Sequence, residues 1–149
     1  MPTLRGSCHC GNISLALETE QEAAKIALRA CSCSFCTRHR ARTMADPAGR
    51  AGIEVRDQAL LSRYRFGLRT AEFIICARCG AYAGALLREG ARAWATLNAN
   101  LFLDPALVRA AESVSYEGET AEARIARRKL RWTPTRFTVL HPAAGGGKS

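Results

Sequence analysis

Apolar and polar residues alternate in several short stretches of the first two-thirds of the chain. In residues 12–17, NISLAL, every second position is apolar, and residues 25–30 alternate in the same way directly before a cysteine. Further short apolar stretches, bounded by glycines and other turn-forming residues, lie at 53–55, 60–66, 72–76, 82–87 and 93–97. A period of two is typical of half-buried β-strands. Many such strands in close succession predict a mainly β domain built from antiparallel meanders.

Helical patterns appear only towards the C-terminal end. Residues 119–131 contain no glycine or proline, and the segment begins with acidic residues and ends with basic ones, as the helix dipole favours. The tripeptide WTP that follows is expected to end this helix. A shorter helix is predicted at 106–111, where a proline precedes the segment. Residues 35–42 are polar and basic, and we predict a loop or turn there.

The length of 149 residues predicts one domain, which we place at residues 1–140, followed by a flexible tail at 141–149. The N-terminal residues lack the apolar segment of a signal peptide, and no apolar run approaches the roughly 20 residues that span a membrane. We therefore expect a cytoplasmic protein with no membrane partner. Disulfides are rare in that compartment, so thiolates bound to metal are the expected role of the seven cysteines.

The formal net charge of +9 favours anionic partners, and 19 of the 22 basic residues are arginine. Arginine can hold a carboxylate through two parallel hydrogen bonds, which lysine cannot do. The alternative is that an arginine-rich chain simply uses arginine as its surface charge.

The clearest motif is Cys76-x-x-Cys79 followed by Gly80. Two cysteines at this spacing, with a glycine that permits a tight turn, can direct both sulfurs to one tetrahedral metal. A redox pair is the alternative, but such pairs usually begin a helix, whereas this motif lies between two predicted strands. We therefore favour metal binding at these two cysteines.

Cys8 and Cys10 supply two more sulfurs near the N-terminus. On an extended segment, residues two apart point to the same face, so this pair and Cys76 with Cys79 can complete one closed four-cysteine site. A structural zinc of this kind contributes on the order of 10 kcal/mol to folding. His9 then faces away from the metal and is expected to have no ligand role.

Cys31, Cys33 and Cys36 remain as a group of three. Three protein ligands and one open position are the arrangement of catalytic zinc sites, so the seven cysteines can be divided into one closed and one open site. An open zinc site polarises an oxygen atom or lowers the pKa of a bound water or thiol. The alternative is a single zinc ribbon in which one of these cysteines is a buried free thiol. Zinc itself is an inference, because iron can occupy the same ligands.

The segment directly after the third of these cysteines is basic. It contains Arg38, His39, Arg40 and Arg42, which could offset the negative charge of a three-thiolate site or hold an anionic substrate. His39 is a candidate proton carrier. The alternative is an ordinary solvated basic turn.

These cysteine groups and several flanking segments together resemble the glutathione-dependent formaldehyde-activating enzyme family, which includes centromere protein V. The resemblance runs from about residue 5 to residue 135. The segments that carry it are Gly6-Ser-Cys-His-Cys-Gly11, Cys31-x-Cys-x-x-Cys36, Tyr64-Arg-Phe-Gly67, Phe73-x-x-Cys-x-x-Cys-Gly80, Leu97-Asn-Ala-Asn100 ahead of Leu103-Asp104, Tyr116-Glu-Gly-Glu119, Arg124-x-x-Arg-Arg128 and Trp132-Thr-Pro134.

The resemblance implies a β-tent fold of short antiparallel strands with one or two C-terminal helices and two zinc ions per chain. It assigns Cys8, Cys10, Cys76 and Cys79 to a structural zinc. It assigns Cys31, Cys33 and Cys36 to the catalytic zinc. It also implies a carbon–sulfur lyase that reversibly joins formaldehyde and glutathione as S-hydroxymethylglutathione, although the substrate of many members is unknown.

Glutathione carries two carboxylates, so arginines near the open site are expected to hold it. The sequence does not choose among Arg5, Arg38, Arg40, Arg42, Arg65 and Arg69. Neither the oligomeric state nor the direction of the reaction follows from the sequence.

Two other classes of function stay open. One is a zinc-stabilised module that binds nucleic acid or another anionic partner, with the basic residues of 124–131 as a phosphate-facing stripe. Aromatic residues make up only 7% of the chain and none interrupts that stripe, which disfavours nucleic acid. The other is a metal-stabilised scaffold without catalysis.

Overall fold

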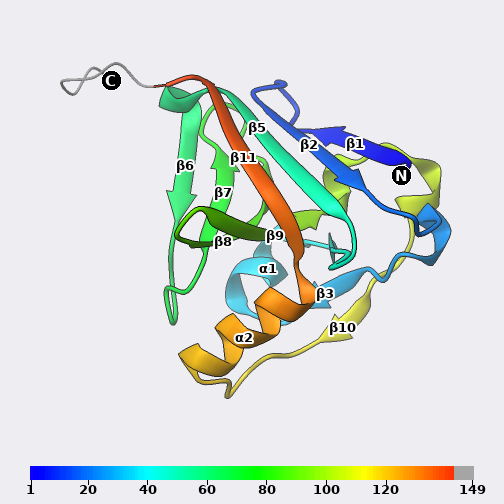
Figure 1. Ribbon diagram of the computed structural model, residues 1–149, viewed down its shortest axis with the longest axis vertical. Helices are drawn as coiled ribbons and strands as arrows, with labels where there is room; N and C mark the ends of the chain where they lie inside the picture. Colours follow the sequence, from blue (N-terminus) through cyan, green and yellow to red (C-terminus); the bar gives the residue numbers. More distant parts are fainter. Residues whose placement is uncertain (143–149) are drawn as a thin grey trace.

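The computed structural model describes residues 1–142 and shows a mainly β domain with a helix near its C-terminal end, as the sequence predicts (Figure 1). The strands are β1 (Thr3–Ser7), β2 (Ile13–Glu18), β3 (Arg29–Cys31), β4 (Thr43–Met44), β5 (Arg50–Asp57), β6 (Leu61–Tyr64), β7 (Glu72–Cys76), β8 (Tyr82–Glu89), β9 (Arg92–Asn98), β10 (Glu112–Val114) and β11 (Thr133–His141). The α-helices are α1 (Ser34–His39) and α2 (Ala121–Arg131), and short 3-10 turns lie at Ala23–Lys25, Gln58–Leu60, Ala99–Leu101 and Pro105–Leu107.

All the strands of residues 1–142 belong to one connected sheet, with β9 as its branch point. One path through the sheet has the order β1-β2-β5-β11-β9-β4-β3-β10, and β6, β7 and β8 extend from the other edge of β9. The long strand β11 joins the two halves, because its first residues pair with β9 and the remainder pairs with β5. Most of these strands overlap the predicted apolar stretches, whereas β1, β4, β10 and β11 were not predicted.

The prediction of purely antiparallel meanders is wrong at two places. β11 pairs with β5 in parallel, and β10 pairs with β3 in parallel. In both cases the partners are far apart in sequence, so no hairpin fixes their relative direction, and the intervening chain is long enough for the connection that parallel pairing requires. Periodicity along one strand carries no information about its distant partner.

The predicted C-terminal helix is confirmed as α2. Thr120 caps it by accepting a hydrogen bond from the N–H of Ala123, and the helix ends at Arg131, directly before the WTP tripeptide. The helix predicted at 106–111 is wrong, because only one 3-10 turn forms at Pro105–Leu107 before the chain extends into β10.

The loop predicted at 35–42 is also wrong, because α1 occupies most of that segment. Cys33 takes the capping position, and its sulfur accepts a hydrogen bond from the N–H of Cys36 at 3.4 Å. The helix ends at His39, and the capping residue Arg40 that follows has a left-handed φ of 52°. Six residues are too few to show a helical period, and a sulfur cap is not among the usual sequence signals of a helix start.

Buried side chains form two clusters. The larger one is aliphatic and fills the space beneath β2, β5, β8 and β9. The smaller one is aromatic and surrounds α1, with Phe35, Phe73, Tyr82, Trp94 and Trp132 as its largest members. The aromatic cluster includes Cys36 and touches Cys31 and Cys33, so it forms the surroundings of the three-cysteine group.

The predicted tail at 141–149 falls largely outside the described residues, which include only its residues 141 and 142. None of the helices in the described part of the chain is long and apolar enough to cross a membrane.

Candidate metal sites and an arginine-lined cavity

The structure brings the cysteines together in the two groups that the sequence predicts. The first consists of Cys8, Cys10, Cys76 and Cys79, and the second of Cys31, Cys33 and Cys36. Within each group every pair of sulfur atoms is separated by no more than 4.8 Å, and all seven cysteines have free thiols. Both groups can therefore hold a metal ion.

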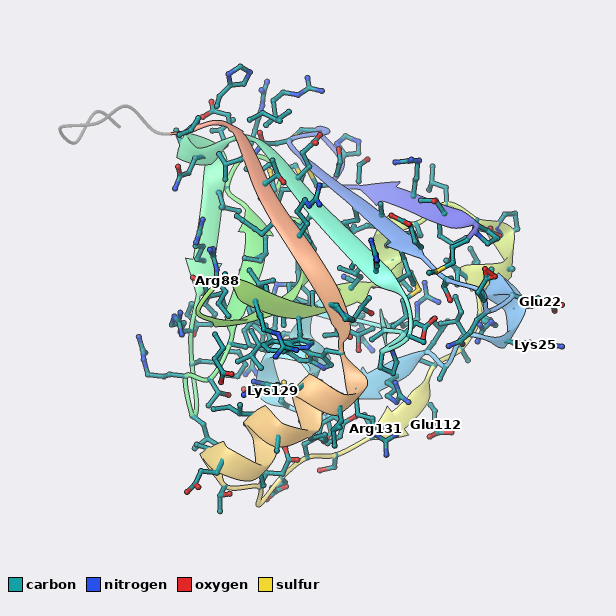
Figure 2. The ribbon with its side chains drawn as sticks, viewed as in Figure 1. Glu22, Lys25, Arg88, Glu112, Lys129 and Arg131 are labelled. Atoms are coloured by element: carbon teal, nitrogen blue, oxygen red, sulfur yellow. The ribbon has the colours of Figure 1, made fainter. Side chains whose placement is uncertain are left out.

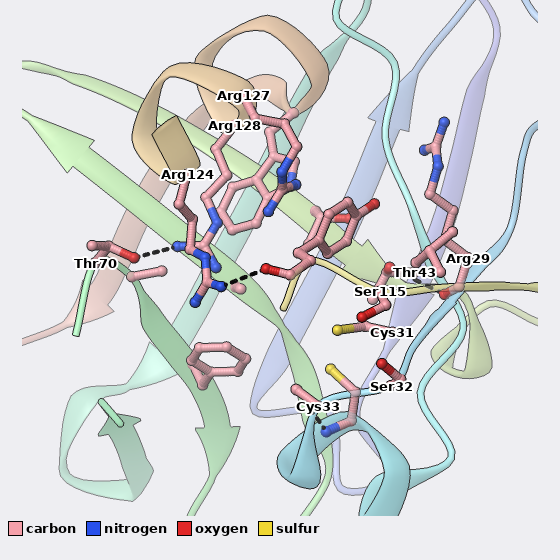
Figure 3. A pocket seen from close by; sticks show the side chains of 18 of the residues that line it. Arg29, Cys31, Ser32, Cys33, Thr43, Thr70, Ser115, Arg124, Arg127 and Arg128 are labelled. Atoms are coloured by element: carbon pink, nitrogen blue, oxygen red, sulfur yellow. Dashed lines mark hydrogen bonds between the residues drawn. The ribbon is translucent and has the colours of Figure 1, made fainter. Parts of the chain in front are cut away.

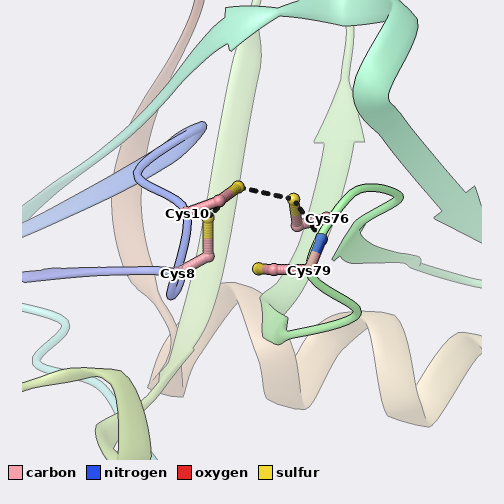
Figure 4. Close-up of side chains that lie close together, drawn as sticks. All are labelled: Cys8, Cys10, Cys76 and Cys79. Atoms are coloured by element: carbon pink, nitrogen blue, oxygen red, sulfur yellow. Dashed lines mark hydrogen bonds between the residues drawn. The ribbon is translucent and has the colours of Figure 1, made fainter.

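The four-cysteine group joins two distant turns of the chain (Figure 4). The sulfurs of Cys8 and Cys10 are 3.8 Å apart, and those of Cys10 and Cys76 are 3.5 Å apart. A tetrahedral zinc ion with sulfur ligands at 2.3 Å requires separations of about 3.8 Å between the sulfurs. The group is thus consistent with a closed zinc site that ties the β1–β2 turn to the β7–β8 turn.

The prediction that Cys8 and Cys10 lie on one extended face is wrong, because β1 ends at Ser7 and both cysteines lie in the turn before β2. The N–H of Gly11 donates to the carbonyl of Cys8 at 3.1 Å, and the N–H of Ile13 donates to the Cys8 sulfur at 3.2 Å. It is therefore the turn that directs the two sulfurs inward. His9 is exposed and does not belong to the group, as the sequence indicates.

The turn of Cys76 to Gly80 has the geometry expected of a metal-binding motif. The N–H of Cys79 donates to the Cys76 sulfur at 3.4 Å, and the N–H of Gly80 donates to the Cys76 carbonyl at 2.8 Å. Gly80 has a φ of +82°, which disfavours any residue with a side chain. The motif joins strands β7 and β8 rather than beginning a helix, so the arrangement favours metal binding over a redox pair.

The three-cysteine group forms where β3 meets α1 (Figure 3). Cys31 ends the strand, Cys33 caps the helix, and Cys36 lies in the first helical turn. No fourth His, Cys, Asp or Glu among residues 1–142 joins this group. A metal ion bound by these three sulfurs would retain an open position.

The three thiols lie close enough to perturb one another's pKa. Bonds from Cys31 and then from Cys36 lower the pKa of Cys33 to about 2. The same contacts, first with Cys31 and then with Cys33, raise the pKa of Cys36 above its ordinary value. Metal ions bind thiolates, so metal binding to this group has to release the protons that its thiols carry.

A cavity of about 600 Å³ opens beside the three-cysteine group and extends to α2 (Figure 3). Its size is within the usual range for sites of small molecules. Aromatic side chains form part of its wall, and its charged lining consists of Arg29, Glu117, Arg124, Arg127, Arg128 and Arg131. None of the four cysteines of the other group lines it. The cavity thus combines an open set of metal ligands with a strongly positive wall.

The orientation of α2 is the reverse of an ordinary surface helix. Arg124, Arg127 and Arg128 face the cavity and are partly or fully buried, whereas Ala126 and Leu130 are exposed to solvent. A surface helix normally buries its apolar residues and exposes its charges. The arginines that the sequence suggested as a phosphate-facing stripe thus form the inner wall of a cavity.

Glu119 fixes two of these arginines. Nε and Nη2 of Arg127 donate to its two carboxylate oxygens at 2.8 and 3.0 Å, and Nε of Arg124 donates to it at 3.1 Å. Hydrogen bonds from Arg127 lower the pKa of Glu119 below its ordinary value, and Arg124 adds to the effect. Arg127 also stacks on the Tyr116 ring, with Cζ at 3.5 Å from its centroid.

Arg128 is the most buried of the arginines in α2, with 8% of its surface exposed. Its Nη1 donates to the hydroxyl of Thr70 at 2.7 Å, and its Cζ lies 4.6 Å from the centroid of the Trp132 ring. Its Nε is buried and has no hydrogen-bond partner among residues 1–142. Burial, followed by the positive charges of Arg127 and Arg124, lowers the pKa of Arg128 to about 10.

The side chains that the sequence proposed for substrate binding lie elsewhere. None of Arg5, Arg38, Arg40, Arg42, Arg65 and Arg69 lines the cavity. His39 does not line it either, and its Nδ1 forms a hydrogen bond with the carbonyl of Phe35 at 3.0 Å while its ring stacks on that of Phe35. The spacing of the α2 arginines indicated one helix face, but no sequence signal showed that this face is turned inward.

Some arginines have a structural role instead. Arg42 donates to Asn100 and to the carbonyls of Leu107 and Arg109. Arg109 in turn donates to the carbonyls of Ala23 and Ile26. These bonds tie loop segments together, so the arginine content is not only surface charge.

Tyr82 is a further cavity residue that the sequence analysis did not single out. It is 3% exposed and packs against Phe35 and Phe73, and its hydroxyl makes no hydrogen bond within residues 1–142. Burial raises the pKa of Tyr82 above its ordinary value, and negative charge on the three-cysteine group raises it further. The phenol therefore stays protonated at neutral pH and is available as a hydrogen-bond donor.

Comparison with known proteins supports the fold but not a function. No protein-family model and no curated protein matches the chain. A solved structure described as a Rhodobacter sphaeroides protein from a structural genomics programme is similar, with 27% sequence identity and a TM-score of 0.54. The match covers 74% of this chain and all of that protein's chain.

Proposed function

We propose that this protein is a zinc-dependent carbon–sulfur lyase that acts on a small thiol adduct of the S-hydroxymethylglutathione type. One observation carries the proposal. The group of Cys31, Cys33 and Cys36, which has no fourth ligand among the described residues, lines a cavity large enough for a small molecule, whereas the four-cysteine group does not. A closed site away from the cavity suits a structural role, and an open site within it suits chemistry.

Cys31, Cys33 and Cys36 would hold the catalytic zinc, and Cys8, Cys10, Cys76 and Cys79 the structural one. When bound, the catalytic ion supplies a Lewis acid that stabilises negative charge on an oxygen of the substrate. The chain's own residues provide the surroundings for this chemistry. Phe66, Phe73 and Trp132 exclude water from one wall, and the protonated hydroxyl of Tyr82 can donate a hydrogen bond to an oxygen in the cavity.

The positive wall of the cavity supports an anionic substrate. Five arginines and a single carboxylate line it, which leaves an excess of positive charge facing the enclosed space. Glutathione adducts carry carboxylates, so their charge is complementary to this wall. The positive wall supports an anion in general, and the resemblance of the chain to the glutathione-dependent formaldehyde-activating enzymes narrows this proposal to a glutathione adduct.

The nucleic-acid alternative is less well supported by the geometry. The exposed side of α2 presents Ala126, Leu130 and one arginine, Arg131. Lys129 is held by Glu89 at 2.5 Å. Figure 2 shows where Lys129 and Arg131 lie on the helix. Arg124, Arg127 and Arg128 line the cavity instead of being displayed together on an exposed surface, as a phosphate-binding stripe requires. Binding to nucleic acid should therefore be weak and vanish at physiological salt.

The proposal is tested by measuring zinc content and turnover on the same preparations. Elemental mass spectrometry should find two zinc ions per chain in the parent and one in Cys33→Ala. Exchange between labelled formaldehyde and glutathione, followed by NMR, should be accelerated by the parent and not by the variant. A Cys33→Ala protein that keeps two zinc ions and full activity would overturn the assignment. A parent protein with two zinc ions that accelerates no thiol–aldehyde exchange would overturn the lyase proposal itself.

A further inference from the structure

Arg128 is a buried charge whose compensation by the described residues is incomplete. It takes part in no ion pair among residues 1–142, and the nearby carboxylate of Glu119 is bonded to Arg124 and Arg127. A buried charge without a counter-ion is costly, and proteins normally pair it or use it to bind a ligand. Its pKa of about 10 still leaves it charged at neutral pH.

The contacts of Arg128 leave one edge of its guanidinium group free. Nη1 is held by Thr70, and one face of the group is covered by Trp132. Nε has no partner, and no hydrogen bond from Nη2 is found within residues 1–142. Nε and Nη2 are the two parallel donors on the same edge of a guanidinium group, and their spacing matches the two oxygens of a carboxylate.

In the neighbouring Arg127, the edge of the guanidinium group formed by Nε and Nη2 binds a carboxylate. Its Nε and Nη2 donate to the two oxygens of Glu119 at 2.8 and 3.0 Å. Arg127 is thus paired with a carboxylate of the chain itself through the edge that is free in Arg128. Both arginines line the cavity, but only Arg128 lacks a carboxylate among the described residues.

We propose that the free Nε and Nη2 edge of Arg128 is a subsite for a carboxylate of the substrate, at the α2 end of the cavity and away from the three-cysteine group. This inference rests on the proposed function for its substrate, a thiol adduct. It narrows the substrate class to thiols that carry a carboxylate on the part of the molecule remote from sulfur. Thr70 and Trp132 are positioning residues, because they fix the plane of the guanidinium group before the ligand arrives.

The test measures binding rather than turnover, on the zinc-loaded protein. Calorimetry compares glutathione with its dimethyl ester, in which both carboxylates are blocked. We expect Arg128→Gln to weaken glutathione binding about 10- to 100-fold, the usual effect of losing hydrogen bonds to a charged group, and to leave ester binding unchanged. Arg128→Lys should restore only part of the loss, because lysine keeps the charge but not the two parallel donors.

The matched control is Arg136→Gln, which removes the same charge from an exposed position on β11 that does not line the cavity. It should leave glutathione binding unchanged. Zinc content and circular dichroism establish that each variant is folded. If Arg128→Gln does not fold, Thr70→Val takes its place and should weaken binding of glutathione but not of the ester.

A second probe separates this inference from the proposed function. Succinate and inorganic phosphate are titrated into the parent and Arg128→Gln while tryptophan fluorescence is recorded, since Trp132 lies against Arg128. If succinate binds only the parent and glutathione binds neither, the carboxylate subsite stands and the thiol substrate is wrong. If glutathione or succinate binds both proteins equally, the subsite is wrong. If phosphate binds in an Arg128-dependent manner and succinate does not, the assignment to a carboxylate is wrong.

Discussion

Replacement of Glu119 by glutamine should measure how strongly the cavity wall is held in place. The carboxylate accepts three hydrogen bonds, two from Arg127 and one from Arg124, and its side chain is 20% exposed. Hydrogen bonds to charged groups contribute about 1.5–3 kcal/mol each, but they are not additive and are weakened here by partial exposure. A glutamine keeps one acceptor oxygen and turns an NH₂ group towards a guanidinium. We therefore expect the free energy of unfolding to fall by about 2 kcal/mol.

Urea denaturation at neutral pH is the direct assay for Glu119→Gln. A loss of this size corresponds to a decrease in melting temperature of about 4–8 °C for a domain of this length. The matched control is Glu89→Gln, which removes a carboxylate that pairs with Lys129 and is itself 57% exposed. An exposed pair of this kind contributes at most about 1 kcal/mol, so the control should be close to the parent.

The pH dependence of this effect has a definite sign. The pKa of Glu119 is lowered on folding from an ordinary value of 4.5, with Arg127 as the main cause. Its contribution to stability is therefore fully present above pH 4.5 and is lost as the pH falls through the lowered pKa of the folded state. The difference between parent and Glu119→Gln should be constant from neutral pH down to weakly acidic pH. Carbon-13 NMR of the carboxyl group should find its titration below the ordinary value.

A double-mutant cycle with Arg127→Gln decides whether the explanation is correct. If the ion pair is the cause, the two substitutions together should cost clearly less than the sum of the two separately. Equal stabilities of Glu119→Gln and Glu89→Gln, or strict additivity in the cycle, would refute the reasoning.

Three further predictions concern the metal site and the backbone. Cys10→Ser should remove one zinc ion per chain and lower the free energy of unfolding by roughly 5 kcal/mol or more, because the four-cysteine group joins two distant turns; unchanged zinc content and stability would contradict this. Arg40→Gly should raise stability by about 0.5–1 kcal/mol in thermal denaturation, since residue 40 has a left-handed φ of 52° at the end of α1; a lower melting temperature would argue against it. Gly84→Ala should lower the free energy of unfolding by about 1–3 kcal/mol, because the added Cβ would lie 2.5 Å from the carbonyl oxygen of Thr96. Gly52→Ala should leave stability unchanged, because the nearest atom to its added Cβ is 4.0 Å away. Equal effects at both glycines would refute the steric explanation.

The strands and the cysteine groups were largely within reach of the sequence. Alternation at 12–17 predicted β2, because one face of that strand is buried and the other is largely exposed. The apolar stretches at 72–76 and 82–87 predicted β7 and β8, most of whose residues are buried on both faces. The division of seven cysteines into four and three followed from local spacing and ligand number. The strand signal and the spacing within each cysteine cluster depend on residues close together in the chain, which a sequence displays directly. The joining of Cys8 and Cys10 with Cys76 and Cys79 followed from the four ligands that a closed zinc site requires.

Features that depend on distant partners were beyond the sequence. The parallel pairing of β5 with β11 depends on contacts between segments far apart in the chain. The helix α1 was missed for a local reason, because it is only six residues long and is capped by a sulfur atom. The turn that carries Cys8 and Cys10 gave the predicted convergence of sulfurs by a different geometry, because hydrogen bonds to Ile13 close the hairpin there.

The cavity shows most clearly what the tertiary structure alone decided. The sequence determined that α2 carries arginines along one face, and that three cysteines form an open group. It could not determine that the two lie across one cavity, because that depends on how α2 docks after the crossover from β10 to β11. Helical periodicity fixes which side chains share a face, but only packing against the rest of the protein decides whether that face meets solvent or a cavity.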